Sequence, residues 1–220
     1  MNRSIIWFRR DLRIGDHPAL NAAIAAGDEV VPLFILDRQQ IDEAGSKLLA
    51  YMSNSLRALD HSLGNRLHII EGDQVEVLRE LIDLYNVTSV HISAEPERYG
   101  AERDARVEAA GIPLVRTGSP YAVYPGRVVK PSDGTPYKVY TPFYKNWCIH
   151  GWRAPAPTPK EIKAPMPPDK YRAFPDFPLP TGAQIIEAGE EAALKRFKSF
   201  MKGAIDSYDE SRNLAGIDGT

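Results

Sequence analysis

The feature that most constrains the fold is a strict alternation, up to Arg116, of short apolar runs with longer segments of helical periodicity. The runs are rich in Ile, Val, Leu and aromatic residues without polar alternation, which is typical of strands buried on both faces. They are residues 4–8, 29–36, 66–70, 89–93 and 112–116. The helical segments between them are residues 18–27, 46–64, 73–86 and 97–111. This alternation predicts a Rossmann-like, doubly wound α/β fold, in which a five-stranded parallel sheet has helices on both faces.

Two residues refine this prediction. Pro32 lies inside the second run and lacks the N–H that a strand ladder needs, so it favours an edge position or a bulge there. Asp16 precedes Pro18 at the start of the first helical segment, and Asp is a common N-cap with Pro in the first turn. We therefore expect Asp16 to cap the first helix.

The character of the chain changes after Arg116. Gly and Pro residues in 117–140 predict a long ordered loop with a hairpin near 128–140, followed by a short helix over 141–149. Nine of the 18 prolines fall in 154–180, which indicates an extended linker. A helix is expected from Glu190, broken at Gly203 and followed by a second.

These patterns divide the chain into three parts. We predict an α/β domain over 1–130, a loop, short helix and proline-rich interdomain linker over 131–187, and the first helices of a further unit over 188–220. The last part carries an apolar stripe without local partner surface, formed by Ala193, Leu194, Phe197, Phe200 and Met201. The stripe predicts that more protein packs on it.

Charge and cysteine content limit the possible partners. The 27 Lys and Arg against 29 Asp and Glu give a formal net charge of −2, so any contact with DNA must be local. The single cysteine, Cys148, excludes an internal disulfide and fits a reducing, cytoplasmic compartment. We expect it to be a small buried side chain within its helix. No apolar stretch approaches the length of a membrane span.

The first candidate site follows the first strand. Arg9, Arg10, Asp11 and Arg13 come where ligands settle in open α/β sheets, outside the carboxyl ends of the strands. Such a cluster suits an anionic or aromatic ligand. The alternative is that Asp11 pairs with an arginine and only fixes the turn. Neither a GxGxxG nor a GxxxxGK[ST] motif follows the strand, which disfavours a conventional dehydrogenase or NTPase.

The second candidate site gathers polar residues from two further strand ends. Asp37 follows the second strand, and Glu95, Glu97 and Tyr99 follow the fourth. With Lys47, Leu48 and Tyr51 they could line a slot for a flat heterocycle. The alternative is that these are ordinary solvated carboxylates at strand ends. The five histidines form no metal motif and no GxSxG motif is present, so we expect neither a metal site nor a catalytic nucleophile in this chain.

Six motifs in order resemble the photolyase/cryptochrome family over essentially the whole chain: WFRRDLRIGDHPAL, LFILD, SLRALDHSL, ERYGAERDARV, YKVYTPFYKNW and YDESRNLAGIDGT. The resemblance implies an N-terminal α/β domain, a linker and a helical domain that holds FAD. In photolyases, light-excited reduced FAD passes an electron to a pyrimidine dimer flipped out of the DNA duplex. The alternatives are a cryptochrome-type photoreceptor and a stand-alone nucleotide- or flavin-binding module.

The resemblance also implies roles for three residues near the end of the sequence. Tyr208 and Thr220 correspond to FAD contacts of the family, and Arg212 corresponds to a contact with the DNA backbone. The sequence ends where the family's flavin-phosphate segment begins. We therefore expect the N-terminal part of a monomeric, light-driven DNA-repair lyase, which lacks most of the FAD site and without the C-terminal helical domain does not repair damaged DNA.

The α/β domain of the family often binds a second, light-harvesting chromophore, which is a reduced folate, a deazaflavin or a flavin. Folate-binding members carry an Asn-Glu pair where this sequence has Tyr99 and Gly100. The resemblance therefore favours a deazaflavin or flavin as the antenna. Its expected polar lining is Arg9, Asp37, Lys47 and Glu97.

Overall fold

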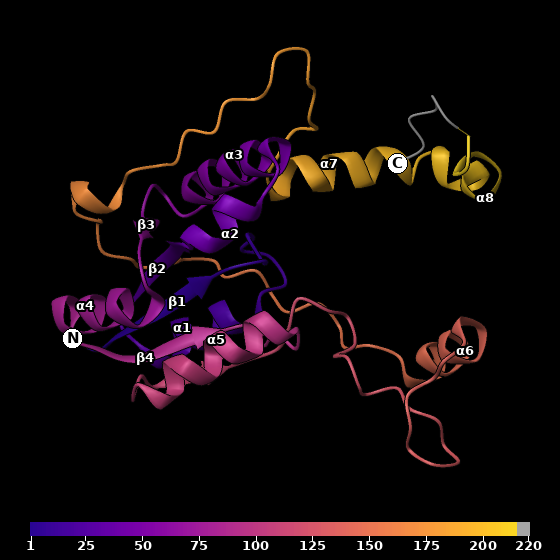
Figure 1. Ribbon diagram of the computed structural model, residues 1–220, viewed down its shortest axis with the longest axis horizontal. Helices are drawn as coiled ribbons and strands as arrows, with labels where there is room; N and C mark the ends of the chain where they lie inside the picture. Colours follow the sequence, from indigo (N-terminus) through magenta and orange to yellow (C-terminus); the bar gives the residue numbers. More distant parts are fainter. Residues whose placement is uncertain (215–220) are drawn as a thin grey trace.

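The computed structural model describes residues 1–214. Its sheet consists of five parallel strands in the order β3-β2-β1-β4-β5 (Figure 1). The strands are β1 (Arg3–Phe8), β2 (Glu29–Leu36), β3 (His68–Glu71), β4 (Val87–Ile92) and β5 (Leu114–Arg116). The chain starts in the middle of the sheet, builds outward to β3 and returns to place β4 on the other side of β1. The predicted doubly wound fold is confirmed, with strand boundaries displaced by at most two residues.

Four long helices cover the two faces of the sheet. They are α1 (Pro18–Ala26), α3 (Ser46–Ser62), α4 (Gln74–Tyr85) and α5 (Arg98–Ala109), all predicted from the helical periodicity. A short helix, α2 (Arg38–Glu43), was not predicted. It begins where the Asp37 carboxylate accepts the Gln39 amide at 3.0 Å, which satisfies an orphan N–H of its first turn.

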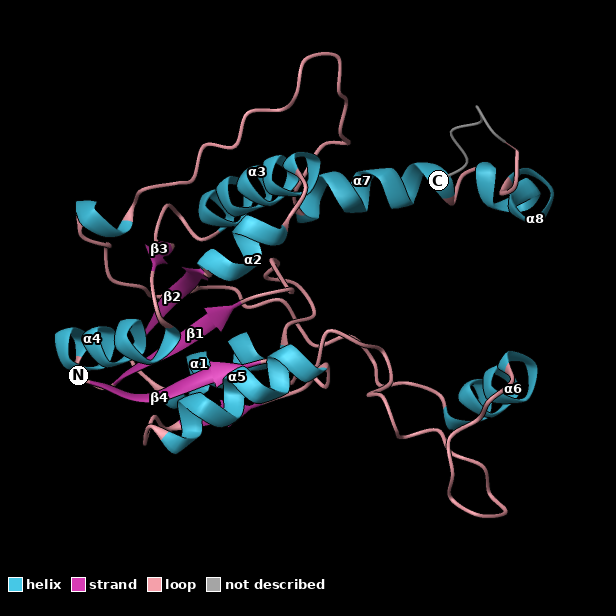
Figure 2. Cartoon of the chain, in the orientation of Figure 1, coloured by secondary structure: helices cyan, strands magenta, loops and turns pink. Residues whose placement is uncertain are grey.

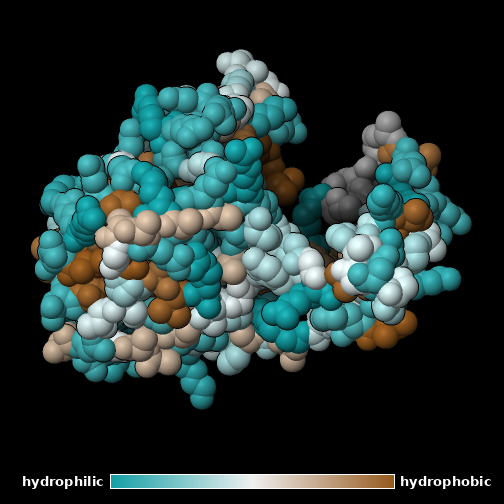
Figure 3. Space-filling model, turned by 60° about the horizontal axis from the view of Figure 1, so that its bottom comes forward, coloured by the Kyte–Doolittle hydropathy of each residue, from teal (hydrophilic) through white to brown (hydrophobic). Residues whose placement is uncertain are grey.

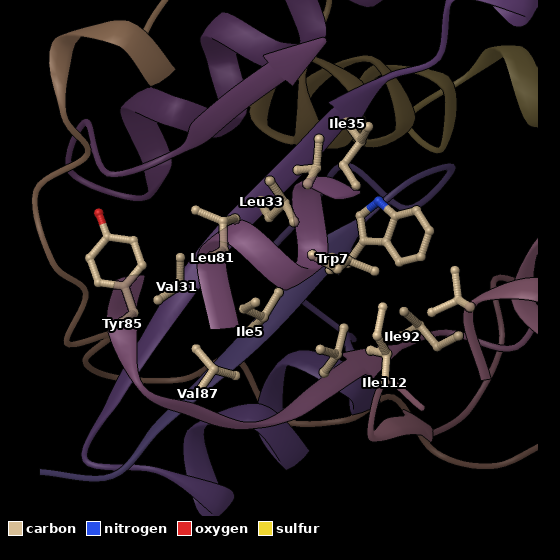
Figure 4. Close-up of a cluster of buried hydrophobic side chains, with 14 of the residues drawn as sticks. Ile5, Trp7, Val31, Leu33, Ile35, Leu81, Tyr85, Val87, Ile92 and Ile112 are labelled. Atoms are coloured by element: carbon tan, nitrogen blue, oxygen red, sulfur yellow. The ribbon is translucent and has the colours of Figure 1, made fainter. Parts of the chain in front are cut away.

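Alternate residues of the strands supply two separate cores. Ile5, Trp7 and Leu33 point to the side of α4 and α5, whereas Ile6 and Phe8 point to the side of α1 and α3. Figure 4 shows part of the first core, with Trp7 and Tyr85 at its opposite ends. Both sides of the sheet are buried, which explains why the strands read as continuous apolar runs.

The expectation that Pro32 marks an edge or a bulge is wrong. β2 lies between β3 and β1, and Pro32 is in regular register with Ile6. The Pro32 carbonyl faces β3, where it accepts the His68 Nδ1–H at 3.1 Å. The N–H and C=O of a strand residue share one edge, so the missing donor also faces β3. Pairing with β3 begins only at Leu33, and therefore no ladder bond is lost.

Asp16 does not cap α1, contrary to prediction. The cap is His17, whose Nδ1 accepts the Leu20 amide at 3.1 Å. Asp16 has φ 46°, in the left-handed region, and its carboxylate accepts Arg153 at 2.6 Å and the Ala156 amide at 2.7 Å. Asp16 thus fastens the incoming linker to the β1–α1 loop rather than starting the helix.

The proline-rich linker lies against the α/β domain for much of its length. We call residues 156–175 the strap. Its carbonyl groups accept side-chain or amide N–H and O–H groups of Asn21, Val30, Ser53 and Arg66. Tyr171, in the short 3-10 helix η1 (Asp169–Tyr171), is 3% exposed and joins the first core. Proline residues keep the strap extended while its carbonyls remain available as acceptors.

Two segments project from the domain. One is the loop after β5 with α6 (Tyr140–His150), and the other is α7 (Glu190–Phe200) with η2 (Ala204–Ser207) and α8 (Tyr208–Ser211). Residues 117–139 form turns without a strand, so the expected hairpin is wrong; Figure 2 shows this stretch as loop. Cys148 is exposed, not buried as expected.

The predicted apolar stripe of α7 is confirmed as exposed. Leu194, Phe197 and Met201 are 50%, 58% and 48% exposed. Figure 3 shows hydrophobic residues on the surface of the right-hand part of the molecule, which carries α6 and α8. Among the described residues, no helix combines the length and the apolar character required to cross a bilayer.

Candidate functional site

A cavity of about 570 Å³ lies at the carboxyl ends of β1, β2 and the segment after β4. The strand order reverses between β1 and β4, which is where open α/β sheets bind ligands. Its walls combine apolar and polar side chains. The apolar ones include Trp7, Phe8, Phe34, Leu36, Ile41, Leu48 and Met52, and the polar ones include Arg9, Arg10, Asp37, Gln74, Glu95, Glu97, Tyr99 and Arg103.

The indole of Trp7 lines the cavity and lies close to two guanidinium groups. Arg9 and Arg103 lie 5.2 and 5.0 Å from the Trp7 ring centre. Both arginines are held by buried carboxylates, since Arg9 contacts Glu95 at 3.2 Å and Asp104 at 2.7 Å, and Arg103 contacts them at 3.3 and 2.9 Å. Burial and the neighbouring Arg103 lower the pKa of Arg9, while the two carboxylates oppose this shift. The network fixes the indole as a rigid aromatic surface.

Gly100 is required by this network. A Cβ at this position would lie 2.8 Å from the Glu95 Cβ and 2.8 Å from its Oε2. Glu95 can therefore reach both arginines only because the first turn of α5 has no side chain at residue 100. The ERYG motif thus supplies a close approach between helix and carboxylate as well as wall residues.

One side of the cavity is closed by a chain of hydrogen bonds. Tyr99 donates its hydroxyl to Asp37 Oδ2, which also accepts Gln74 Nε2 at 2.6 Å. Gln74 in turn accepts Arg106. Burial, followed by the bond to Asp37, raises the pKa of Tyr99 to about 12, so the phenol remains protonated and donates near neutral pH. Beyond this barrier lies a second, polar hollow of about 730 Å³.

Glu97 presents an acceptor that the protein leaves without a donor. Its Oε1 accepts the Tyr121 hydroxyl and lies 3.0 Å from Arg10 Nη1. Its Oε2 is buried and has no hydrogen-bond partner among the described residues. Because a buried carboxylate oxygen is costly to leave unsatisfied, this atom indicates a ligand N–H or O–H donor.

Asp11 holds the loop after β1 in place, which agrees with the structural alternative given for the first candidate site. Its side-chain partners are Ser93 and His17, however, and not an arginine. Its Oδ2 accepts the Ser93 hydroxyl and lies 3.0 Å from His17 Nε2. Burial alone would raise the pKa of Asp11. The bonds from His17, Ser93 and the Arg9 amide outweigh burial and hold that pKa well below its usual range. The ionised carboxylate joins the β1–α1 loop to α1 and β4.

The family model for DNA photolyase matches residues 4–161. The chain belongs to the DNA photolyase family. It is 32% identical to a Synechococcus deoxyribodipyrimidine photo-lyase, over 98% of this chain and 49% of that protein. The match to chicken cryptochrome-2 has 30% identity and covers 64% of this chain and 26% of that one.

The chain spans about half the length of the curated photolyases it matches. It spans 81% of a shorter relative, an uncharacterized 31.6 kDa Synechococcus protein that is 32% identical over 98% of this chain.

Solved structures show the same relationship. A class III photolyase from Agrobacterium tumefaciens superposes with a TM-score of 0.79 at 28% identity, over 100% of this chain and 48% of that one. The photolyase of Sulfolobus tokodaii, solved with two FAD molecules, gives a TM-score of 0.59 at 25% identity, over 76% of this chain and 38% of that one.

Three of the four residues expected to line an antenna site of this photolyase-family chain border one cavity. These are Arg9, Asp37 and Glu97. The side chains of Arg9 and Asp37 already form ion pairs or hydrogen bonds with other residues of the protein. Lys47 is exposed and borders none of the described cavities, whereas its neighbour Leu48, itself 62% exposed, borders this one.

The residues implied by the resemblance to hold FAD and DNA are not brought together with this cavity. Tyr208 begins α8, 38% exposed, with its ring edge against Phe200. Arg212 ends the same helix, and Thr220 lies outside the described residues. Among residues 1–214, no group of His, Cys, Asp or Glu side chains could hold a metal ion.

Trp7 and Arg103 line the cavity but were not among the residues predicted from the sequence. Trp7 belongs to an apolar strand run and Arg103 to a charged helix, so neither stands out alone. A signal was present in the helical spacing, since Tyr99, Arg103 and Arg106 follow at i, i+4 and i+7 and therefore share one face of α5.

Proposed function

We propose that the protein is the N-terminal part of a deoxyribodipyrimidine photolyase and that its cavity binds a light-harvesting chromophore. Curated photolyases match over 98% of the chain, whereas the match to chicken cryptochrome-2 covers 64% of it, which supports repair over signalling. The single observation that carries the binding role is the cavity itself, whose lining includes the Trp7 indole and a buried Glu97 oxygen without a donor.

The residues present fit a flat heterocycle. A volume of about 570 Å³ lies within the usual range of small-molecule sites. Trp7, Phe34, Leu48 and Met52 line the cavity and supply apolar contact. Glu97 Oε2 would accept a ring N–H, which fixes the orientation of the ring. The Tyr99–Asp37 bond closes one wall and so keeps water away from that edge.

We favour a deazaflavin or a flavin over a folate as the ring system. Tyr99 and Gly100 replace the Asn-Glu pair of folate-binding members, and Gly100 serves the Glu95 network instead. The Sulfolobus tokodaii photolyase contains two FAD molecules, with the implication of a novel light-harvesting cofactor, which supports a flavin in this fold. When bound, such a chromophore absorbs blue light and passes the excitation energy to the repair cofactor.

For the whole protein we propose light-driven, FAD-dependent splitting of cyclobutane pyrimidine dimers, by a monomeric cytoplasmic enzyme. Residues 1–130 would form the antenna unit, 131–187 the linker and 188–220 the start of the FAD-binding unit. Tyr208 and Thr220 are proposed FAD contacts and Arg212 a DNA contact, by motif match. The exposed apolar residues of α7 support further protein packing there.

The binding role is tested by titrating the purified chain with riboflavin, 5-deazariboflavin and a simple pterin. Quenching of tryptophan fluorescence should report binding of the first two ahead of the pterin. Glu97→Gln should weaken the flavin by about tenfold, because it removes a charge-assisted acceptor. Glu43→Gln, an exposed change on α2, should not. Equal binding by wild type and Glu97→Gln would remove Glu97 from the site.

Repair is tested on the native gene product isolated from its source cells. Blue light should restore dimer-containing DNA, and the dark control should not. Absence of repair by protein loaded with FAD would favour the cryptochrome alternative. The stand-alone module is favoured by the short Synechococcus relative, and a native mass near 24.5 kDa would support it.

A further inference from the structure

Two hollows adjoin the proposed chromophore cavity, and they differ in how they connect to it. The polar hollow shares Asp37, Gln74, Tyr99 and Arg103 with the cavity. The second is a groove of about 800 Å³ between the β1–α1 loop, α3 and α7. It shares four residues with the cavity, Arg9, Arg10, Leu48 and Met52. Either of the two could receive the part of a ligand that extends beyond one ring system.

The passage to the polar hollow is closed. Tyr99 and Gln74 both donate to Asp37 Oδ2, and Arg106 holds Gln74 from behind. At the other passage Leu48 is 62% exposed, the Arg10 side chain is 59% exposed, and the bond at its rim is the Arg10–Glu97 ion pair at 3.0 Å. The groove is therefore the more open of the two exits.

Among its described lining residues, the polar hollow offers no unpaired arginine to an anion. Its lining has four carboxylates, Asp37, Glu71, Asp73 and Glu102, against three arginines. Each arginine is already paired with a carboxylate: Arg38 with Glu71, Arg103 with Glu95 and Arg106 with Asp73. Glu102 is paired with Arg98, which lies outside the hollow. An anionic group placed there would therefore find, in this lining, no arginine that is free of a carboxylate partner.

The groove, in contrast, is lined by an arginine that is not paired with a carboxylate. Its three carboxylates are satisfied by other donors: Asp11 by Ser93 and His17, Asp16 by Arg153 and the Ala156 amide, and Glu190 by the Ile14 and Gly15 amides at 2.9 and 3.0 Å. Arg13 donates to the carbonyl oxygens of Gly15 and Asp16 at 3.1 and 2.9 Å. Within residues 1–214 it forms no ion pair with a carboxylate.

We infer that the chromophore carries an anionic tail, and that this tail leaves the cavity past Leu48 and Arg10 to lie against Arg13. The inference rests on the proposed antenna function and adds the direction and charge of the ligand. A phosphate on a ribityl chain and the carboxylates of a glutamyl chain share this chemistry. Arg13 is then a specificity residue, which distinguishes tailed from tailless forms of one ring.

The test compares riboflavin with FMN, which differ by one phosphate, in titrations of the full chain. The wild type should bind FMN at least about tenfold more tightly, as a charge-assisted contact to phosphate provides. Arg13→Ala should weaken FMN to the level of riboflavin and leave riboflavin unchanged. Arg13→Lys should retain part of the preference, and added salt should reduce it. Circular dichroism checks that each variant is folded.

Glu102→Gln, in the polar hollow, is the matched control and should change neither ligand. Tighter FMN binding in this variant, with the preference intact in Arg13→Ala, would overturn the inference by placing the tail in the polar hollow. A second pair, methenyltetrahydrofolate and its analogue without glutamate, identifies the source. If the preference that depends on Arg13 is seen for FMN over riboflavin, the tail is a phosphate. If it is seen for methenyltetrahydrofolate over its analogue without glutamate, the tail is a carboxylate.

The remaining outcomes separate this inference from the proposed function. If riboflavin and FMN bind equally to the wild type, and the folate pair does too, the tail inference is wrong and the antenna function stands. If no member of either pair binds, the antenna function is wrong and the tail inference falls with it.

Discussion

Buried His68 makes the stability of the protein depend on pH in a window set by its imidazole. The side chain is 0% exposed on β3, with Nδ1 3.1 Å from the Pro32 carbonyl and 3.2 Å from the Arg66 carbonyl. Its Nε2 lies 2.9 Å from the Tyr85 hydroxyl. Two carbonyls at Nδ1 require the proton there, so Nε2 accepts from Tyr85 and the ring is neutral. Burial lowers the pKa of His68 from 6.5 to about 4.

The sign and size of the effect follow from proton linkage. Between pH 6.5 and about 4 the unfolded chain binds a proton at this residue and the folded chain does not. Stability is therefore full above pH 6.5 and falls as the pH is lowered. At about 1.4 kcal/mol for each tenfold difference, the loss is about 3 kcal/mol at pH 4. Asp11 contributes below this window, because its pKa lies well under the usual range.

Urea unfolding at pH 7, 6, 5 and 4 measures this loss. His68→Gln should have lower stability at pH 7 and a flatter pH dependence, by about 3 kcal/mol across the window. Exposed His61→Gln should follow the wild type. Buried His91, whose pKa is also lowered by burial, is present in all three proteins and cancels in the comparison. Parallel curves for wild type and His68→Gln would refute the reasoning, as would an NMR titration of His68 near pH 6.5.

Three further predictions concern the helices. Gly100→Ala should destabilise the protein by about 2 kcal/mol or more in denaturant unfolding. The new Cβ would displace Glu95, and this cost outweighs the roughly 1 kcal/mol gain in helix propensity. A variant more stable than the wild type would contradict the close approach of Glu95 to residue 100. Phe197→Ser should change the unfolding free energy by less than about 0.5 kcal/mol, whereas Leu20→Ala should cost about 2 to 5 kcal/mol. Glu190→Gln should speed amide exchange at residues 14 and 15, since charge-assisted bonds of about 1.5 to 3 kcal/mol are weakened; unchanged exchange would show that α7 does not hold the loop.

The sheet and its helices could be predicted because both depend on local periodicity. The predictions that were wrong, for Pro32 and for the cap of α1, depend on residues distant in sequence. Whether Pro32 loses a ladder bond is decided by where β3 begins to pair, and the cap of α1 passed to His17 because Arg153 occupies Asp16. The sequence shows neither Leu33 opposite His68 nor the return of the linker to the first loop.

The candidate site could be predicted in outline for a topological reason. Arg9, Asp37 and Glu97 follow strand ends, and parallel strands bring their carboxyl ends to one edge. Which atoms remain available could not be predicted, because Asp37 caps α2 and receives Tyr99 in the folded chain. Lys47 does not border the cavity, whereas its neighbour Leu48 on α3 does.

The strap has a consequence for the outer edge of the sheet. β3 pairs with β2 on one side only, and on the other side Ile69 forms a bridge with Arg172 of the strap. Arg172 also reaches the Asn65 carbonyl at 2.7 Å. An uncovered edge strand with adjacent isoleucines is a template for pairing between molecules. By covering the free edge of β3, the strap is expected to prevent pairing between molecules. If the strap detached, the first sign would be self-association of otherwise folded protein.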